Sequence, residues 1–383
     1  MRANASGEHH AWAPSRWNDR LKSWRDRCLA APRFQQWASR FALTRPVARR
    51  HAGALFDLCA GFVYSQVLLA CVRLGLFELL RAGPLRLKEL CWRLELTEVA
   101  LRPLLAAAQA LSLVEPRAPD QWGLGTLGAA LLGNPAVPAM IEHHAMLYRD
   151  LSDPVALLRT PQARGELARL WPYARNHDPS QLAAGQIEAY TALMAQTQTL
   201  VAEELLDAYP LSRHRCLLDV GGGNGTFLVT AALRAPRLRL MLFDLPAVAE
   251  QARVRLQAAG LQQRAQTYGG DFASGQLPAG ADLITLVRVL HDHDDDAAMT
   301  LLQAAHRALP TGGSVLLAEP MAGVRGALPG TEAYFAFYLL AMGQGRVRSA
   351  AQIAQMLRAA GFRRPRLRAT ARPWQCAVVS ALA

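Results

Sequence analysis

Lysine is almost absent from this chain of 383 residues. Only Lys22 and Lys88 are lysines, and the other 40 of the 42 basic residues are arginine; with 30 acidic residues the formal net charge is +12. Such a one-sided use of arginine indicates a GC-rich coding bias, so part of the charge carries no functional meaning. A basic surface still favours anionic partners such as nucleic acid or membrane headgroups.

Paired cysteines, an export signal and a long apolar run are also missing. The six cysteines are scattered and form no CxxC pair, which argues against a disulfide or zinc framework and indicates a reducing compartment. The N-terminus has no basic-then-apolar pattern, and Asp19 and Asp26 argue against a transit peptide. No apolar run approaches the roughly 20 residues of a membrane-spanning helix. We therefore expect a cytoplasmic protein that does not cross a bilayer.

The chain shows no internal repeat, and its only biased segments are alanine-rich helices. Hydrophobic residues make up 51% and charged residues 19%, so it can bury proper cores, and its length predicts two or three domains. Changes of pattern divide it into a basic N-terminal extension (1–50), a winged-helix module (51–135), a helical connector (136–210) and an α/β domain (211–383).

The N-terminal extension contains a basic amphipathic helix. Trp17, Leu21, Trp24 and Cys28 fall on one helical face, and further aromatic residues follow up to about residue 41. A helix of this kind can lie in a membrane interface. The alternative is that its apolar stripe docks on the body of the protein or on a second subunit.

Residues 51–135 have the element order of a winged helix. Successive short helices lead to Leu113-Val114-Glu115 and to a turn at Gly123–Gly128, which together predict a hairpin. Such modules often bind DNA, so a DNA-binding regulator is the hypothesis that does not involve an enzyme. The helix that would read the groove, near Thr97–Ala110, carries leucines and alanines suited to packing. We therefore expect no nucleic acid partner.

From about residue 211 apolar strands alternate with helical stretches. The expected core strands are Cys216–Val220, Leu238–Phe243, Leu283–Val289 and Ser314–Ala318. Alternation of this kind predicts an α/β fold with a doubly wound, mostly parallel, Rossmann-like sheet covered on both faces.

A glycine-rich turn follows the first of these strands. Gly221, Gly223 and Gly225 have GxGxG spacing, which differs from the GxGxxG that holds the pyrophosphate of NAD. Asp219 precedes the turn, where a carboxylate would repel a pyrophosphate but suits an ammonium or sulfonium group. The turn therefore predicts a site for S-adenosylmethionine.

Two further acids follow neighbouring strands. Asp244 lies 21 residues after Gly223, close to the separation at which an acid reaches ribose hydroxyls, and Leu245 follows it. Asp271 and Phe272 lie where a carboxylate and an aromatic ring could contact the adenine. Each acid alone can also be read as a helix cap or turn former.

The segment at the end of the strand Leu283–Val289 supplies the candidate base. Arg288 opens it as a cofactor-binding candidate, and His291 is expected to act as general base toward a substrate hydroxyl. Glu319, at the end of the next strand, could orient His291, or it could be a solvated strand end. The acids Asp294–Asp296 are expected to cap the next helix; the alternative is a divalent metal site, and we expect no metal.

A helix around Tyr334–Met342 is rich in aromatic residues and leucine. Tyr338 and Met342, with Met194 from the connector, are expected to line a pocket for a large apolar substrate; the alternative is core packing. His143 and His144 are interpreted as an ordinary helix surface.

The motifs occur in a specific order. The winged-helix module is followed by Leu-Leu-Asp-Val-Gly-Gly-Gly-Asn-Gly, Phe-Asp-Leu-Pro, Gly-Asp-Phe, Arg-Val-Leu-His-Asp and Leu-Ala-Glu-Pro. From about residue 55 to the end this order resembles the class I small-molecule O-methyltransferases of the caffeate and acetylserotonin type. The resemblance implies an intertwined homodimer formed through the N-terminal module, S-adenosylmethionine as methyl donor and His291 as base.

The N-terminal run, from Ala-Ala-Pro-Arg-Phe-Gln-Gln-Trp to Phe-Asp-Leu-Cys-Ala-Gly-Phe-Val-Tyr-Ser-Gln, is similar to a narrower group. This group is the hydroxyneurosporene (demethylspheroidene) O-methyltransferases of purple phototrophic bacteria, which methylate the tertiary 1-hydroxyl of acyclic carotenoids. The resemblance implies peripheral contact with the photosynthetic membrane, where such a substrate resides.

One position departs from the family pattern. Plant members carry a second glutamate beside the histidine, and the matching position here is Val347. Only Glu319 is then left to support His291. Methylation of a bacteriochlorophyll precursor or of an aromatic polyketide is the alternative activity.

Overall fold

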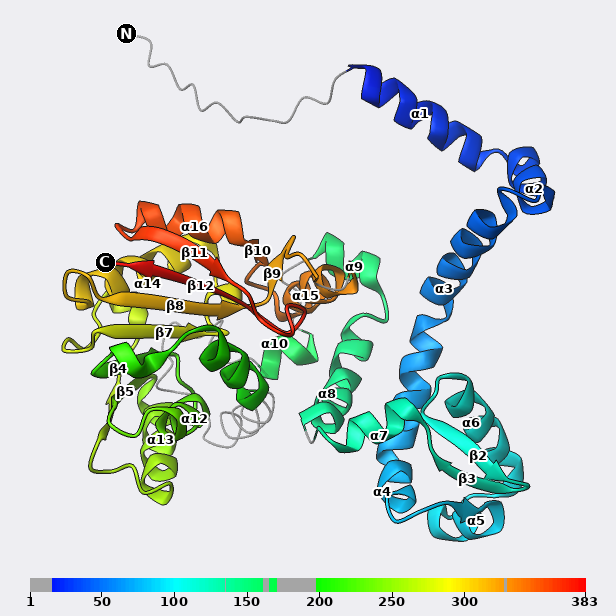
Figure 1. The fold of residues 1–383 in the computed structure, drawn as a ribbon, viewed down its shortest axis with the longest axis horizontal. Helices are drawn as coiled ribbons and strands as arrows, with labels where there is room; N and C mark the ends of the chain where they lie inside the picture. The colour runs from blue at the N-terminus through cyan, green and yellow to red at the C-terminus, as the bar shows by residue number, and fades with distance from the viewer. Residues whose placement is uncertain (1–15, 135, 161–164, 171–197, 327–328) are drawn as a thin grey trace. The chain divides into compact units, whose positions relative to one another are not determined.

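A computed structural model describes residues 16–134, 136–160, 165–170, 198–326 and 329–383 (Figure 1). Met194, a predicted substrate contact, lies outside these ranges. The chain divides into two compact units, which are treated separately below. The first contains residues up to Leu74 together with Leu85–Gly123, and the second contains Gly75–Pro84 and Leu124–Ala383.

The first unit is mainly helical. Its elements are α1 (Arg16–Ala30), α2 (Pro32–Arg40), α3 (Arg45–Arg73), β1 (Leu85–Arg86), α5 (Leu87–Leu94), α6 (Glu98–Ala110), β2 (Val114–Ala118) and β3 (Gln121–Leu124). The three strands form a small sheet in the order β1-β3-β2. The predicted hairpin therefore exists, but its turn lies near Asp120, which has a positive φ of 53°, and not at Gly123–Gly128. That glycine-rich stretch instead ends β3 and begins the next helix.

Helix α6 has the packing role that its composition predicts. The Thr97 hydroxyl accepts a hydrogen bond from the Ala100 amide and so caps its first turn. Leu101, Leu105 and Ala108 are fully buried, and the helix packs against α3. The apolar side of the helix is thus used for the core.

Helix α3 corrects the expectation that no segment is long and apolar enough to cross a membrane. By length and composition it passes that test, with a mean hydropathy of 1.8 over its most apolar window, of which 11% is buried. The sequence predicts a domain boundary at residue 50 and successive short helices after it. In the structure 29 residues form one helix, because Pro46 stands in its first turn and no other proline interrupts it.

The second unit begins with helices that include the connector. They are α4 (Leu76–Leu80), α7 (Thr126–Leu132), α8 (Ala136–Asp150), α9 (Pro154–Arg159) and α10 (Glu166–Leu170), and residues 198–208 are also helical. α8 and α10 pack against each other and against α15 (Pro329–Met342). The described part of the connector is therefore helical, as predicted.

A seven-stranded sheet forms the centre of the second unit. Its strands are β4 (Cys216–Val220), β5 (Arg239–Asp244), β6 (Ala265–Gly269), β7 (Leu283–Val287), β8 (Ser314–Glu319), β11 (Arg363–Arg368) and β12 (Ala377–Leu382). Their order is β11-β12-β8-β7-β4-β5-β6, and β4 to β8 are parallel while β12 and β11 are antiparallel to their neighbours. The predicted doubly wound, mostly parallel sheet is confirmed.

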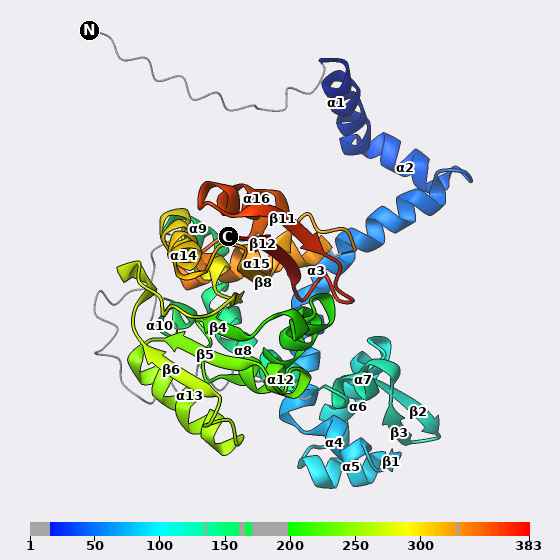
Figure 2. The same cartoon turned by 60° about the vertical axis from the view of Figure 1, so that its left-hand side comes forward.

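Helices cover both faces of this sheet (Figures 1 and 2). Alternate residues of β4 face opposite layers: Cys216, Leu218 and Val220 share a core with α14 (Asp295–Ala308) and α16 (Ala350–Ala359). Leu217 shares the other core with α12 (Thr226–Arg234) and α13 (Pro246–Ala258). β4 pairs with both β5 and β7, so the chain changes direction at its carboxyl end, where folds of this type bind ligands.

Short elements decorate that carboxyl edge. They are the 3₁₀ turns η4 (Phe272–Ser274) and η5 (Leu290–Asp292), and the strands β9 (Met321–Ala322) and β10 (Arg348–Ser349), which pair in parallel. A third 3₁₀ turn, η3 (Leu211–Arg213), precedes β4 and so lies at its amino end. η4 follows β6 and η5 follows β7, so both turns stand at the edge that also carries the glycine turn.

Candidate active site

The glycine turn joins β4 to α12. Gly221, Gly223 and Gly225 all have positive φ, at 68°, 56° and 80°, where other residues are strained. A Cβ on Gly221 would lie 2.7 Å from the Val289 side chain, whereas a Cβ on Gly223 would meet no atom within 4 Å. The turn is therefore packed beside Gly221 and open beside Gly223, and only the open side has room for a ligand.

Asp219 is the buried acid next to this turn. The residue is 1% exposed; its Oδ1 accepts the Thr285 hydroxyl at 2.7 Å, and its Oδ2 has no hydrogen-bond partner among the described residues. Burial raises the pKa of Asp219 to about 7, and the charge of Asp244 adds to the rise while the Thr285 bond opposes it. A buried carboxylate oxygen without a partner is costly, so it favours a ligand that brings a donor or a positive charge.

Asp244 meets the glycine turn as its spacing predicts. Its Oδ2 accepts the Gly223 amide at 2.8 Å and its Oδ1 accepts the Leu245 amide at 2.7 Å. Burial raises the pKa of Asp244 to about 6, and these two bonds oppose the rise. The carboxylate is thus fixed at the end of β5, and each oxygen keeps a lone pair for a hydroxyl donor.

Asp271 and Phe272 reach the same edge. The Gly270 amide donates to the Asp244 carbonyl at 2.9 Å, which places their turn beside Asp244. Asp271 is exposed and accepts the Ala273 amide, so it caps η4, the alternative role considered for it. Phe272 packs edge-on against His293, with ring centroids 4.9 Å apart.

These residues fit S-adenosylmethionine. The turn is open at Gly223, whose amide is bound by Asp244, and it is preceded by Asp219, which has a buried carboxylate oxygen without a partner among the described residues. Asp219 would take the charged amino acid end and Asp244 the ribose, while Asp271 and Phe272 remain candidates for the adenine. A buried acid, Asp219, and a half-buried one, Asp244, would repel a pyrophosphate at the same place.

His291 and Glu319 form the second part of the site. His291 is 8% exposed, and its Nδ1 lies 2.6 Å from Oε2 of Glu319. The Glu319 carboxylate also accepts the amides of Val289 (3.0 Å) and Leu290 (2.7 Å). Glu319 is therefore a buried residue that holds η5 in place through hydrogen bonds, and it is not a solvated strand end.

Asp292 is a site residue that the sequence reading missed. Its Oδ1 lies 3.1 Å from Nε2 of His291, the nitrogen that Glu319 leaves free. Burial raises the pKa of Asp292 to about 6, while the neighbouring His291 opposes the rise. The second acid beside the histidine is thus supplied by the adjacent residue. The sequence shows an aspartate next to His291, but adjacency alone does not predict that the Asp292 carboxylate contacts the His291 ring.

The two carboxylates set the basicity of His291. Burial lowers its pKa, but the charges of Asp292 and Glu319 and the hydrogen bond to Glu319 outweigh burial, so the net shift is upward from 6.5; Arg288 opposes it. A raised pKa makes the imidazole a stronger base when it is neutral.

The segment Gln344–Arg348 closes over η5 and was also missed. Arg348 is 2% exposed and donates to the carbonyls of Leu290 (2.7 Å) and His293 (2.8 Å), as well as to Asp295. The Arg346 amide donates to the His291 carbonyl at 2.9 Å. Glu319 thus holds the amides of η5, the candidate catalytic turn, while the segment 344–348, which we call the clasp, holds its carbonyls.

Arg288 stands directly after β7 with a positive φ of 60°. Its charge is a minor influence, after burial, on the pKa of His291, Asp292, Tyr338 and His143, so it lies near these four side chains. A non-glycine residue held in this conformation is strained, and such strain is typical of functional positions.

The acids after His293 have structural roles. Asp294 accepts the Ala297 amide at 2.9 Å and caps α14, as predicted. Asp295 binds Arg348 and Arg346. Within the ranges that the structure describes, no group of three or more His, Cys, Asp or Glu side chains is arranged to hold a metal ion.

The histidine pair of α8 corrects the sequence reading, which placed it on the surface. His143 is buried, and its Nε2 lies 2.8 Å from the Tyr338 hydroxyl; His144 Nε2 lies 2.7 Å from the Tyr334 hydroxyl. Burial lowers the pKa of His143 to about 4, so it is neutral. α8 and α15 thereby form a wall of neutral rings whose tyrosine hydroxyls are occupied.

This wall reaches the candidate base. Phe335 of α15 stands edge-on to His291, with ring centroids 6.3 Å apart, and Tyr334 stands edge-on to Phe335. Met342, the other predicted contact on α15, is buried in a cluster with Leu147 and Leu339. Met342 therefore occupies a core-packing position, which is the alternative to lining the substrate pocket.

Comparison with known proteins gives the class. The O-methyltransferase domain family matches residues 148–363, and the O-methyltransferase dimerisation domain family matches residues 56–134. Among solved structures, the S-adenosylmethionine-dependent methyltransferase SibL superposes with a TM-score of 0.73 at 27% identity, covering 86% of this chain and 98% of SibL.

Curated relatives are similar over nearly the whole length. The demethylspheroidene O-methyltransferase of Cereibacter sphaeroides is 44% identical over 93% of both chains, and that of Rhodobacter capsulatus is 42% identical over 93% of this chain and 88% of its own. The acetylserotonin O-methyltransferase of Mus musculus is 32% identical, covering 84% of this chain and 86% of its own.

The chain therefore belongs to the O-methyltransferase family, and it is an enzyme that uses S-adenosylmethionine as its methyl donor. It carries the dimerisation domain of that family. The resemblance drawn from the motifs is confirmed.

Proposed function

We propose that this enzyme transfers the methyl group of S-adenosylmethionine to the tertiary 1-hydroxyl of an acyclic carotenoid of the demethylspheroidene or hydroxyneurosporene type. The 44% identity over 93% of both chains with a demethylspheroidene O-methyltransferase carries this proposal. The neutral aromatic wall of α8 and α15 supports it, because its paired hydroxyls leave ring faces for an apolar chain.

The proposed chemistry uses a base beside a bound methyl donor. The bound S-adenosylmethionine supplies an electrophilic methyl group on a sulfonium. His291 Nε2 accepts the hydroxyl proton as the new O–CH₃ bond forms and the methyl–sulfur bond breaks. Because an alcohol is a weak acid, proton removal accompanies attack. The hydroxyl takes the place beside Nε2 that Asp292 holds in this structure.

The other site residues position these groups. Glu319 keeps Nδ1 protonated, so that Nε2 presents its lone pair. The cofactor-binding set is proposed to comprise Asp219, Gly221, Gly223, Gly225, Asp244, Leu245, Asp271, Phe272 and Arg288. The substrate side is proposed to include Tyr338 and Met194, while Met342 packs in the core cluster with Leu147 and Leu339.

The domains have corresponding proposed roles. Residues 51–135 form the intertwined homodimer, 136–210 contribute to the substrate pocket, and 211–383 bind the cofactor and carry the chemistry. Residues 1–50 contact the photosynthetic membrane from the cytoplasmic side, as a peripheral segment.

Methyl transfer to defined acceptors tests the proposal. The enzyme is incubated with S-adenosylmethionine labelled on its methyl group and a detergent-dispersed 1-hydroxy acyclic carotenoid, and the same carotenoid without the hydroxyl serves as control. Label in the hydroxylated carotenoid alone is the expected result. If an aromatic polyketide or a bacteriochlorophyll precursor is methylated and the carotenoid is not, the acceptor assignment is wrong.

Glu319→Gln tests how the base is tuned. The carboxylate raises the pKa of His291, and activity requires neutral His291, so activity falls as the pH drops through that pKa. Removing the charge should move this acidic limb of the kcat/KM profile to lower pH and reduce activity at neutral pH roughly tenfold. A purely structural glutamate would lower activity without moving the limb.

Asp219→Asn tests the cofactor site. Because Asp219 has a pKa of about 7, it becomes negative between pH 6 and 8, and affinity for S-adenosylmethionine should rise over that range. The variant should bind roughly tenfold more weakly at pH 8 and lose this rise. Calorimetric titration measures it, with the exposed Asp207→Asn, outside the proposed cofactor-binding set, as control. Equal pH dependence in wild type and variant would contradict the assignment.

A further inference from the structure

Helices α1 and α2 form a surface that the family's dimerisation domain does not include. The domain match begins at residue 56, whereas α1 and α2 end at Ala30 and Arg40. The two helices, the connection that follows α2 and the start of α3 nevertheless carry large exposed apolar side chains: Leu21, Trp24, Leu29, Trp37, Phe41, Leu43 and Val47. A large exposed apolar surface of this kind marks an interaction site, so we expect a binding partner to cover it.

The charge of the protein is concentrated on the same segment. Between Arg16 and Arg50 there are ten basic and two acidic residues, a net charge of +8 out of +12 for the whole chain. A coding bias toward arginine explains the choice over lysine, but it does not explain this clustering or the scarcity of acids. The occupant therefore carries negative charge.

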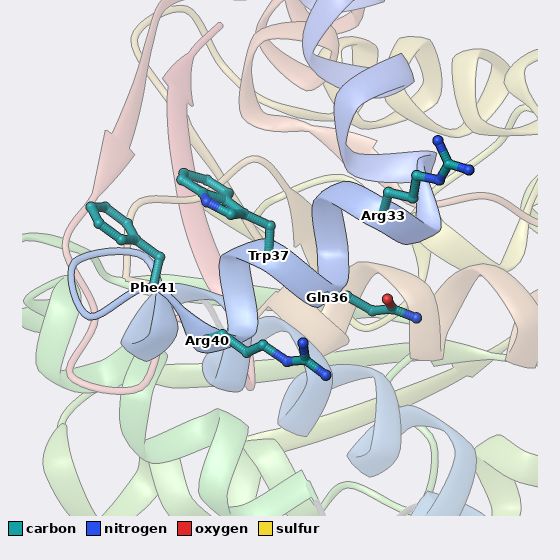
Figure 3. A pocket seen from close by; sticks show the side chains of 5 residues that line it. All are labelled: Arg33, Gln36, Trp37, Arg40 and Phe41. Atoms are coloured by element: carbon teal, nitrogen blue, oxygen red, sulfur yellow. The ribbon is translucent and has the colours of Figure 1, made fainter.

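Helix α2 shows how the two features combine (Figure 3). A hollow of about 430 Å³ is lined by Arg33, Gln36, Trp37, Arg40 and Phe41. The Trp37 and Phe41 rings stack with centroids 5.0 Å apart, and they are 49% and 43% exposed. Figure 3 shows these rings on one side of the helix and the Arg40 and Gln36 side chains on the other.

Each part of the hollow suits a bilayer surface. Aromatic rings of this kind prefer the headgroup level of a membrane, and the guanidinium fork binds phosphate oxygens. Basic side chains beside an apolar face are typical of helices that lie in the plane of an interface.

We infer that α1 and α2 dock the enzyme on an anionic lipid bilayer, with the Trp37–Phe41 side in the interface and the arginines on lipid phosphates. The inference rests on the proposed function, because a carotenoid acceptor is dissolved in the membrane. Docking there brings the enzyme to its substrate. A second copy of this segment is a poor occupant, since a symmetric contact would bring two +8 segments together.

Vesicle binding of the full chain tests the inference without carotenoid or cofactor. Sedimentation with phosphatidylcholine vesicles that contain phosphatidylglycerol should capture the wild type, and capture should fall with salt. Arg33→Gln combined with Arg40→Gln should weaken binding roughly 30-fold, at about fivefold for each arginine. Trp37→Ser should weaken it at equal net charge.

The control removes the same charge elsewhere. Arg237→Gln combined with Arg255→Gln, both exposed in the second unit, should bind vesicles as the wild type does. The Arg33/Arg40 variant should keep its activity on detergent-dispersed acceptor and lose it on acceptor presented in anionic vesicles. This separates the inference from the proposed function, which stands or falls with the detergent assay.

Three results would overturn the inference. If the Arg237/Arg255 control variant lost as much vesicle binding as the Arg33/Arg40 variant, the protein would be attracted to the vesicles by its net charge alone. Unchanged binding in the Arg33/Arg40 and Trp37 variants would place the membrane contact elsewhere or nowhere. A change of oligomeric state by light scattering, with vesicle binding intact, would make a second copy the occupant.

Discussion

Replacing His291 by alanine should lower kcat/KM by roughly 10²–10⁴ while affinity for S-adenosylmethionine stays close to that of the wild type. The reason is geometric. His291 is buried, its Nδ1 is held by Glu319 at 2.6 Å, and its Nε2 faces the position beside Asp292 that the acceptor hydroxyl would take. Removing the ring removes the proton acceptor and leaves the glycine turn untouched.

The neighbouring histidine provides the matched control. His293 lies two residues further along, and its ring packs edge-on against Phe272. His293→Ala should therefore retain most activity, with any effect appearing in cofactor affinity. Single-turnover rates together with cofactor titrations of both variants give the comparison. An active His291→Ala enzyme would mean that the acceptor loses its proton elsewhere, and Asp292 would be the first candidate.

The central fold could be predicted because its signals are local. The strand from Cys216 to Val220 is uniformly apolar except for Asp219, and it runs directly into glycines whose positive φ a turn requires. The 21-residue spacing from Gly223 to Asp244 reflects one helix and one strand of ordinary length, and the two residues do meet. Chain connectivity alone brings such neighbours together.

Edge elements gave weaker signals. β11 consists largely of arginine and exposes most of its residues, so neither its composition nor an apolar alternation marks it as a strand. Its structure depends on pairing with β12, which is itself antiparallel to β8. The sequence of β11 or of β12 alone does not predict that the two strands pair.

The missed site residues depend on tertiary approach. His143 and Tyr338 are 195 residues apart, and each could equally be a surface or core residue of its own helix. Arg348 lies 58 residues beyond the Leu290 carbonyl that it binds. The family pattern marks Val347 as the position where a glutamate is missing. It does not predict that the clasp around Val347 contacts the catalytic turn through its backbone and through Arg348.

Gly345 is the position where this backbone approach is closest, and Gly345→Ala should be the most damaging small substitution outside the catalytic groups. A Cβ there would overlap the carbonyl oxygen of His291 and lie 3.0 Å from backbone atoms of Asp292. Neither neighbour can turn aside as a side chain would. The catalytic turn must shift, and a shift of about 1 Å at the base costs roughly 10²-fold in rate.

Gly312→Ala isolates this clash from backbone strain. Gly312 has φ of +82° and Gly345 has φ of +84°, so alanine pays a similar penalty of about 1–2 kcal/mol at both positions. A Cβ on Gly312 meets no atom within 4 Å, so only strain is felt there. Gly312→Ala should lose only the stability that backbone strain costs, whereas Gly345→Ala should lose more because of the clash, and only Gly345→Ala should lose kcat. Equal kcat in the two variants would show that the clasp does not position His291, and Glu319 alone would then fix the base.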